Sequence, residues 1–187
     1  MTIESAHRAA VLGRQWLALA ALLLVVACGQ TEAPAPRPSP SDEWLTFEGS
    51  WTATGTRRAL HLDPDHRAAI FDLTGSLLLT GEQRPAVGFQ AQAIGFYDSR
   101  DGMLGRCIWT DERGEKVYSE LKGEAIGSGH RIVGTFTGGT GRYAGLSGEY
   151  AFQWQYVIDS EDGGVSGRAV DLKGRVRLAE PAGAQSK

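Results

Sequence analysis

The segment Glu149-Tyr-Ala-Phe-Gln-Trp-Gln-Tyr-Val-Ile-Asp159 decides the fold, because its apolar and polar residues alternate one by one. An extended chain places the apolar set on one face: Tyr150, Phe152, Trp154, Tyr156 and Ile158. The opposite face is mostly polar: Glu149, Ala151, Gln153 and Gln155. Successive side chains of a β-strand point to opposite sides, so this period of two predicts a strand with one buried face.

The next segment predicts a hairpin partner for this strand. Asp162-Gly-Gly164 is a turn sequence, and residues Gly167–Leu178 alternate again. We expect the inward face of this second strand to carry Val170, Leu172, Val176 and Leu178. Its outward face would carry the charged residues Asp171, Lys173, Arg175 and Arg177.

The rest of the chain repeats this pattern of strand and turn. Further predicted strands are Trp44–Thr54, Ala68–Thr80, Val87–Tyr97, Met103–Thr110, Lys116–Ala125 and Arg131–Phe136. Asp111-Glu-Arg-Gly114 is typical of a tight hairpin loop, and no segment after residue 28 keeps a helical period over three turns. About eight strands in a domain of this size favour an all-β, small antiparallel barrel. A two-sheet β-sandwich is the alternative.

A glycine-rich segment separates two of these strands: Phe136-Thr-Gly-Gly-Thr-Gly-Arg-Tyr-Ala-Gly-Leu-Ser-Gly148. It resembles a stretch of the barrel superfamily that includes plant allene oxide cyclases and dirigent proteins. The hairpin Arg106–Tyr118 is similar to one in uncharacterised secreted bacterial proteins that share the stretch. The resemblance covers roughly residues 103–178 and implies an eight-stranded antiparallel barrel. No catalytic residue of the cyclases can be placed by motif. From the residues themselves, we expect Tyr143 and Leu146 to plug one end of the barrel.

The N-terminus has the parts of an export signal. Arg8 and Arg14 precede the unbroken apolar run Leu17–Val26, which is far shorter than the ~20 residues that span a bilayer. Ala27-Cys28 follows and resembles the lipobox of bacterial lipoproteins, in which the chain is cleaved before a cysteine that becomes acylated, for example with palmitate. A plain signal peptide with a chance cysteine is the alternative.

This resemblance implies a domain order and a location. Residues 1–27 are predicted to be the lipoprotein signal peptide, 28–42 a proline-rich lipid-anchored tether, 43–180 the β-barrel domain and 181–187 a disordered tail. The expected partner is the membrane, reached through lipid on Cys28. By analogy with lipoprotein sorting, Gly29 in place of Asp directs the protein to the outer membrane, facing the periplasm, if the cell is Gram-negative.

Charge and cysteine content exclude some classes of function. The formal net charge of −3 argues against nucleic acid as a partner, because phosphate binding needs a basic patch. If Cys28 is acylated, Cys107 has no partner for a disulfide. We expect Cys107 to be a buried, unreactive thiol, since Arg106 would point to the other face of its strand.

Three short motifs resemble catalytic or metal sites but fit turns better. His61-Leu-Asp-Pro-Asp-His66 has metal-binding residue types, although Asp-Pro-Asp is an ordinary turn sequence. Gly139–Gly145 is one residue too long for a dinucleotide fingerprint, and Gly145-Leu-Ser-Gly-Glu149 lacks the last glycine of a nucleophile elbow. No catalytic residue, metal ligand or cofactor is therefore assigned.

The aromatic row Tyr150, Phe152, Trp154 and Tyr156 is either barrel core or the lining of a pocket. Small residues on the facing strands leave room for packing or for a void: Ala91, Ala93, Gly95, Ser119 and Gly123. We expect tight packing at one end and a modest pocket at the other. The function predicted is a non-enzymatic, lipid-anchored barrel module that binds a small apolar ligand or an envelope component. The alternatives are a cyclase or isomerase acting on an apolar substrate, and a structural or protein-interaction module.

Overall fold

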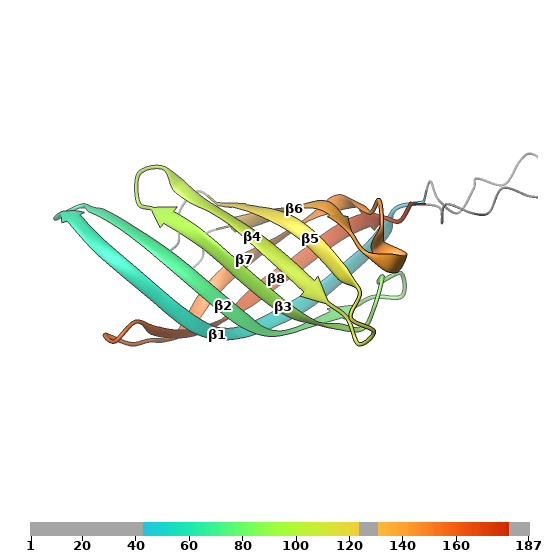
Figure 1. The fold of residues 1–187 in the computed structure, drawn as a ribbon, viewed down its shortest axis with the longest axis horizontal. Coiled ribbons are helices and arrows are strands. Elements are labelled where there is room, and N and C mark those ends of the chain that lie inside the picture. The colour runs from blue at the N-terminus through green and yellow to red at the C-terminus, as the bar shows by residue number, and fades with distance from the viewer. Residues whose placement is uncertain (1–42, 124–130, 180–187) are drawn as a thin grey trace, which may run out of the picture. The chain divides into compact units, whose positions relative to one another are not determined.

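A computed structural model describes residues 43–123 and 131–179 and shows a closed, all-β barrel (Figure 1). Its strands are β1 (Leu45–Asp63), β2 (His66–Thr80), β3 (Gly88–Asp98), β4 (Gly102–Thr110), β5 (Lys116–Gly123), β6 (Arg131–Gly139), β7 (Ser147–Asp159) and β8 (Gly164–Arg177). Each strand pairs antiparallel with the next, and β1 pairs with β8. This last pairing closes the barrel and excludes the two-sheet sandwich.

Some predictions fall outside the described residues. These are the signal peptide, the acylated Cys28, the tether and the C-terminal tail. Within residues 43–123 and 131–179, no helix is long and apolar enough to cross a membrane.

The strands occur in the predicted order, but the first hairpin is longer than expected. β1 continues past Thr54 to Asp63, and β2 begins at His66 instead of Ala68. The register pairs Arg57 with Phe71 and His61 with Arg67. The predicted His61–His66 turn is therefore confined to the two residues between these strands.

Two predicted inward positions are wrong. A β-bulge gives β8 one extra residue relative to both of its neighbouring strands, β1 and β7. Asp171 lies in this bulge and adopts a positive φ of 53°. Because of this bulge, Ala169 faces the interior, 1% exposed, while Val170 does not. Ile158 is 56% exposed, because the end of β7 runs past the packed part of the barrel.

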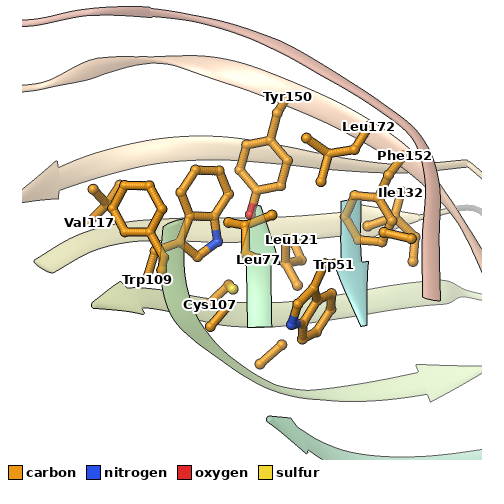
Figure 2. Packing of buried hydrophobic residues seen from close by; sticks show 14 of the residues in the cluster. Trp51, Leu77, Cys107, Trp109, Val117, Leu121, Ile132, Tyr150, Phe152 and Leu172 are labelled. Carbon is orange, nitrogen blue, oxygen red and sulfur yellow. The ribbon is translucent and has the colours of Figure 1, made fainter. Parts of the chain in front are cut away.

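Aromatic rings fill the barrel interior. Trp109 packs against Tyr150 with ring centroids 4.7 Å apart, and Trp51 packs against Trp154 at 5.4 Å. Figure 2 shows Trp109 beside Tyr150, with Trp51 and Phe152 in the same cluster. The two voids within the core have volumes of only about 20 and 10 Å³, so the middle of the barrel holds at most a single water in this conformation.

Small residues and one polar pair make this dense packing feasible. Ala91 and Ala93 lie buried on β3 opposite the large rings. An added Cβ at Gly134 would lie 2.1 Å from the Tyr150 ring, so a side chain there is excluded. The Tyr150 hydroxyl reaches Ser119 Oγ at 2.8 Å, which satisfies the two buried hydroxyl groups.

The glycine-rich segment seals one end of the barrel, as expected. It forms a short 3₁₀ turn, η2 (Gly141–Tyr143), and both Tyr143 and Leu146 are buried. The Asp111 carboxylate lies beneath this turn and accepts hydrogen bonds from the Arg142 guanidinium and from Tyr143 Oη. Asp111 also holds its own loop, because Oδ1 accepts from the backbone N–H groups of Arg113 and Glu115 at 2.8 and 2.9 Å.

Candidate functional site: a cup at the barrel mouth

The end of the barrel opposite η2 is the mouth. The β1–β2 and β7–β8 hairpins both project at this end (Figure 1). There, the inward faces of β1, β2, β3 and β7 emerge from the core and line an open cup of about 100 Å³. Its lining residues are Arg57, Ala59, His61, Arg67, Ala69, Phe71, Tyr97 and Tyr156.

Strand register orders the β1 and β2 residues of the cup by depth. Arg57 pairs with Phe71 at the floor, beside Tyr156 of β7. Ala59 pairs with Ala69 above them, and Ala69 also pairs with Tyr97 of β3. His61 and Arg67 form the top rung. The lining thus passes from two aromatic rings and Arg57 at the floor, through small side chains, to His61 and Arg67 at the rim.

The floor of the cup is held by one ion pair. Arg57 Nη2 lies 2.7 Å from Asp159 Oδ1 of β7, and its guanidinium carbon lies 5.7 Å from the centre of the Tyr156 ring. Burial raises the pKa of Tyr156, and the nearby Arg57 charge opposes that shift. Tyr156 therefore keeps its proton at neutral pH and presents a neutral hydroxyl group.

The rim carries an unpaired positive charge. Among the described residues, none forms a hydrogen bond or ion pair with the Arg67 guanidinium, although its backbone N–H donates to Ser99 Oγ at 3.0 Å. Arg57, in contrast, is already neutralised by Asp159. Arg67 is thus the cation of the cup that is available to a ligand.

Polar contacts to the β3–β4 turn hold the projecting β1–β2 hairpin in place. His66 Nε2 lies 2.9 and 3.0 Å from the two carboxylate oxygens of Asp98, and Arg100 Nη2 lies 2.8 Å from Asp63. The backbone N–H of Arg100 is the largest cause of a lowered Asp98 pKa, followed by the hydrogen bond with His66. These contacts fix the wall of the cup on the β1–β2 side.

The residues of the predicted metal motif do not assemble into a metal site. Among the described residues, no three His, Cys, Asp or Glu side chains group closely enough to hold an ion. His66 and Asp63 instead contact Asp98 and Arg100. The His66–Asp98 pair is also absent from the lining of the cup, so it does not face a ligand bound there.

The predicted aromatic row is divided between core and cup. Tyr150, Phe152 and Trp154 are buried in the packed interior, and Tyr156 is half-buried at the cup floor. The void of about 20 Å³ below the floor is lined by Phe152 and Trp154 and shares Phe71 and Tyr156 with the cup. The Phe71 and Tyr156 rings therefore separate the cup from the interior.

Two indole groups beneath the floor are polar but unpaired. Trp51 Nε1 and Trp154 Nε1 are both buried without a hydrogen-bond partner. Both rings also line the small void under Phe71 and Tyr156. One water molecule fits a void of that size and could accept a bond there.

Cys107 is confirmed as a buried free thiol. Burial raises its pKa to about 12, so the thiolate is negligible at neutral pH. Arg106 points outward from the same strand and pairs with Glu120 at 2.8 Å. No cation of that strand therefore activates the thiol, as the sequence predicted.

Sequence reasoning missed most of the cup, including Arg57, Arg67 and Tyr97. A weak signal was present, since the odd-numbered residues of β1 run from Trp51 through Ala53 to Arg57, Ala59 and His61 on one face. The apolar alternation ends at Gly55, and only the pairing with β2 shows that the same face continues.

No protein-family profile matches the chain, and no curated protein matches it. Among solved structures, a pterocarpan synthase dirigent protein is similar to this chain, with 13% sequence identity and a TM-score of 0.44. The match covers 82% of this chain and 99% of that protein's chain. The activity in that protein's name belongs to that protein.

Proposed function

We propose that this chain is a lipid-anchored envelope protein whose barrel is a non-enzymatic module for binding a small, largely apolar molecule. The cup at the mouth is its binding site. The observation that carries the proposal is the change along the inward faces of the strands. A filled aromatic core gives way to an open cup of about 100 Å³ with an aromatic floor and polar rim.

The volumes favour the mouth over the barrel centre. The core voids of about 20 and 10 Å³ are too small for any organic ligand, whereas a cavity of about 150 Å³ holds benzene. The cup is open on one side, so a single ring can sit in it and project outward. Tyr97 and Tyr156 suit this role, because each offers an apolar ring and a polar tip.

The binding experiment uses the acylated full-length protein in detergent and a neutral aromatic probe, 4-fluorobenzamide. Its ¹⁹F resonance should broaden and shift as protein is added, because the ring exchanges into the cup. The change in chemical shift should reach a plateau at high protein concentration. Tyr156→Ala removes part of the cup floor and should weaken binding at least fivefold.

Tyr118→Ala is the matched control, since Tyr118 lies on β5 outside the cup lining. This variant should bind the probe as the parent protein does and report any partition into detergent. Loss of binding in both variants, or saturable binding in neither variant nor parent, would remove the proposal. If Trp154→Ala lowers the stability of the protein and no variant changes probe binding, the aromatic row serves only as barrel core.

A further inference from the structure

We propose that the cup selects a small aromatic acid, with the ring seated over Phe71 and Tyr156 and the carboxylate held at the rim by Arg67. This inference rests on the proposed function and specifies the chemical class of its ligand. It is drawn from two observations. Asp159 neutralises Arg57 but nothing neutralises Arg67 among the described residues, and the lining residues follow a fixed order with depth.

The charge inside the cup is positive after its internal pair is counted. Arg57 and Asp159 neutralise each other at 2.7 Å, which leaves the Arg67 guanidinium without an acidic partner among the described residues. A guanidinium presents paired N–H donors that match the two oxygens of a carboxylate. An anionic group at the rim would complete this pair, whereas a cationic ligand would face an uncompensated charge.

The order of the rungs sets the polarity of the ligand. The floor offers the Phe71 and Tyr156 rings together with the ion-paired Arg57. The middle rung has the short side chains of Ala59 and Ala69, and His61 and Arg67 lie at the top. A molecule with an apolar ring at one end and an acid at the other matches this order along a single axis. The reversed orientation would place the acid against aromatic faces, which carry negative charge density. The guanidinium at that depth, Arg57, is already neutralised by Asp159.

The size of the cup limits the apolar part to a single ring. Its volume of about 100 Å³ is below the ~150 Å³ of a cavity that binds benzene, and drug-sized pockets begin near 300 Å³. The floor also blocks entry to the core, because Phe71 and Tyr156 close the void beneath them. A long acyl chain therefore has no space to extend inward in this conformation.

The close packing of Phe71 against β3 supports its role as a floor. An added Cβ at Gly95 on β3 would lie 2.4 Å from Phe71 Cζ, so only glycine leaves space for the ring in this position. Arg57 in turn packs over Tyr156. Each floor ring thus packs against a neighbouring strand, Phe71 against β3 and Tyr156 against β1.

The test compares 4-fluorobenzoate with the neutral isostere 4-fluorobenzamide on the acylated full-length protein. We expect the benzoate to bind at least tenfold more tightly. Arg67→Gln should reduce benzoate affinity at least tenfold and change benzamide affinity less than twofold, because only the acid uses the guanidinium. Arg67→Lys should give an intermediate loss, since it keeps the charge but not the paired donors.

Arg58→Gln is the matched control. It removes the same charge from the same hairpin, but from the position next to Arg57 on the opposite face of β1. Its affinity for both probes should match that of the parent. Equal binding of benzoate and benzamide, or equal losses in Arg67→Gln and Arg58→Gln, would overturn the carboxylate proposal and leave the binding function standing. Binding of neither probe would overturn both.

Discussion

Replacing Asp111 with asparagine should loosen the sealed end of the barrel while keeping the shape of the side chain. In the parent protein, one carboxylate oxygen accepts from two backbone N–H groups of its loop, and the other accepts from Arg142 and Tyr143. Asparagine has one acceptor oxygen. It can serve the loop or the η2 turn, but not both.

The cost can be worked out from these contacts. The Tyr143 hydroxyl, on a residue that is fully buried, would lose its acceptor, which costs about 1–3 kcal/mol. Losing the ion pair with Arg142 adds less than a fully buried pair would, because the Arg142 side chain is 33% exposed. We therefore expect Asp111→Asn to lower the free energy of unfolding by about 2–4 kcal/mol at pH 7.

The effect of Asp111→Asn should depend on pH. Burial by itself raises the Asp111 pKa, but hydrogen bonds from the backbone N–H groups of Arg113 and Glu115 and from Arg142 outweigh it, so the folded-state pKa is lowered. A lowered carboxyl pKa gives stability above the unfolded value of about 3.9. This stability is lost as the pH falls through the folded value, so parent and variant should converge below about pH 4.

Urea unfolding followed by tryptophan fluorescence, repeated from pH 7 to pH 2, measures both effects. The control is Glu112→Gln on the same loop, whose carboxylate is 66% exposed and 3.7 Å from Arg142. Exposed pairs of this kind contribute about 0–1 kcal/mol, so the control should unfold almost as the parent does. A loss below about 0.5 kcal/mol in Asp111→Asn at pH 7, or a loss that stays constant down to pH 2, would refute this reasoning.

Three further predictions concern other parts of the chain. Cys28→Ser should abolish labelling with radioactive palmitate and release the protein from the membrane fraction. Unchanged labelling and fractionation would refute the proposed lipid anchor. Cys107 should react with a polar thiol reagent only after unfolding, because it is buried with a pKa near 12; rapid reaction of the native protein would contradict this. Tyr150→Phe should cost about 1–3 kcal/mol by leaving Ser119 Oγ unpaired. Adding Ser119→Ala should cost less than it does alone, and strict additivity in this double-mutant cycle would show that the pair is not coupled.

The sequence was most informative wherever a strand has one face in the core. Tyr150, Phe152 and Trp154 alternate with polar residues along β7, and burial follows that alternation. The sealing role of Tyr143 and Leu146 was also predictable, because large apolar residues inside a glycine-rich turn have no other place to be buried. Such patterns are local, so they can be recognised without knowledge of the partner strands.

The mouth was not predictable because its residues lie beyond the core. Past Gly55, the inward face of β1 carries Arg57 and His61, so hydrophobic alternation no longer marks the strand. The bulge at Asp171 likewise shifts the register of β8 by one residue, and no residue typical of a turn marks that position in the sequence. Arg67 faces His61 only through the register of β1 against β2, which depends on the closed barrel as a whole.

The even number of strands has a practical consequence for protein engineering. Because β1 starts and β8 ends at the end sealed by η2, Leu45 and Arg177 pair there with neighbouring strands. Among the described residues, the turns β1–β2, β3–β4 and β7–β8 lie at the mouth. A reporter or a surface linkage joined directly before Leu45 or after Arg177 therefore starts from the end of the barrel opposite the cup. The turns of the mouth can also be diversified as a library while the sealed end and the core stay constant. The barrel thus places the proposed binding cup and the outer ends of β1 and β8 at opposite poles.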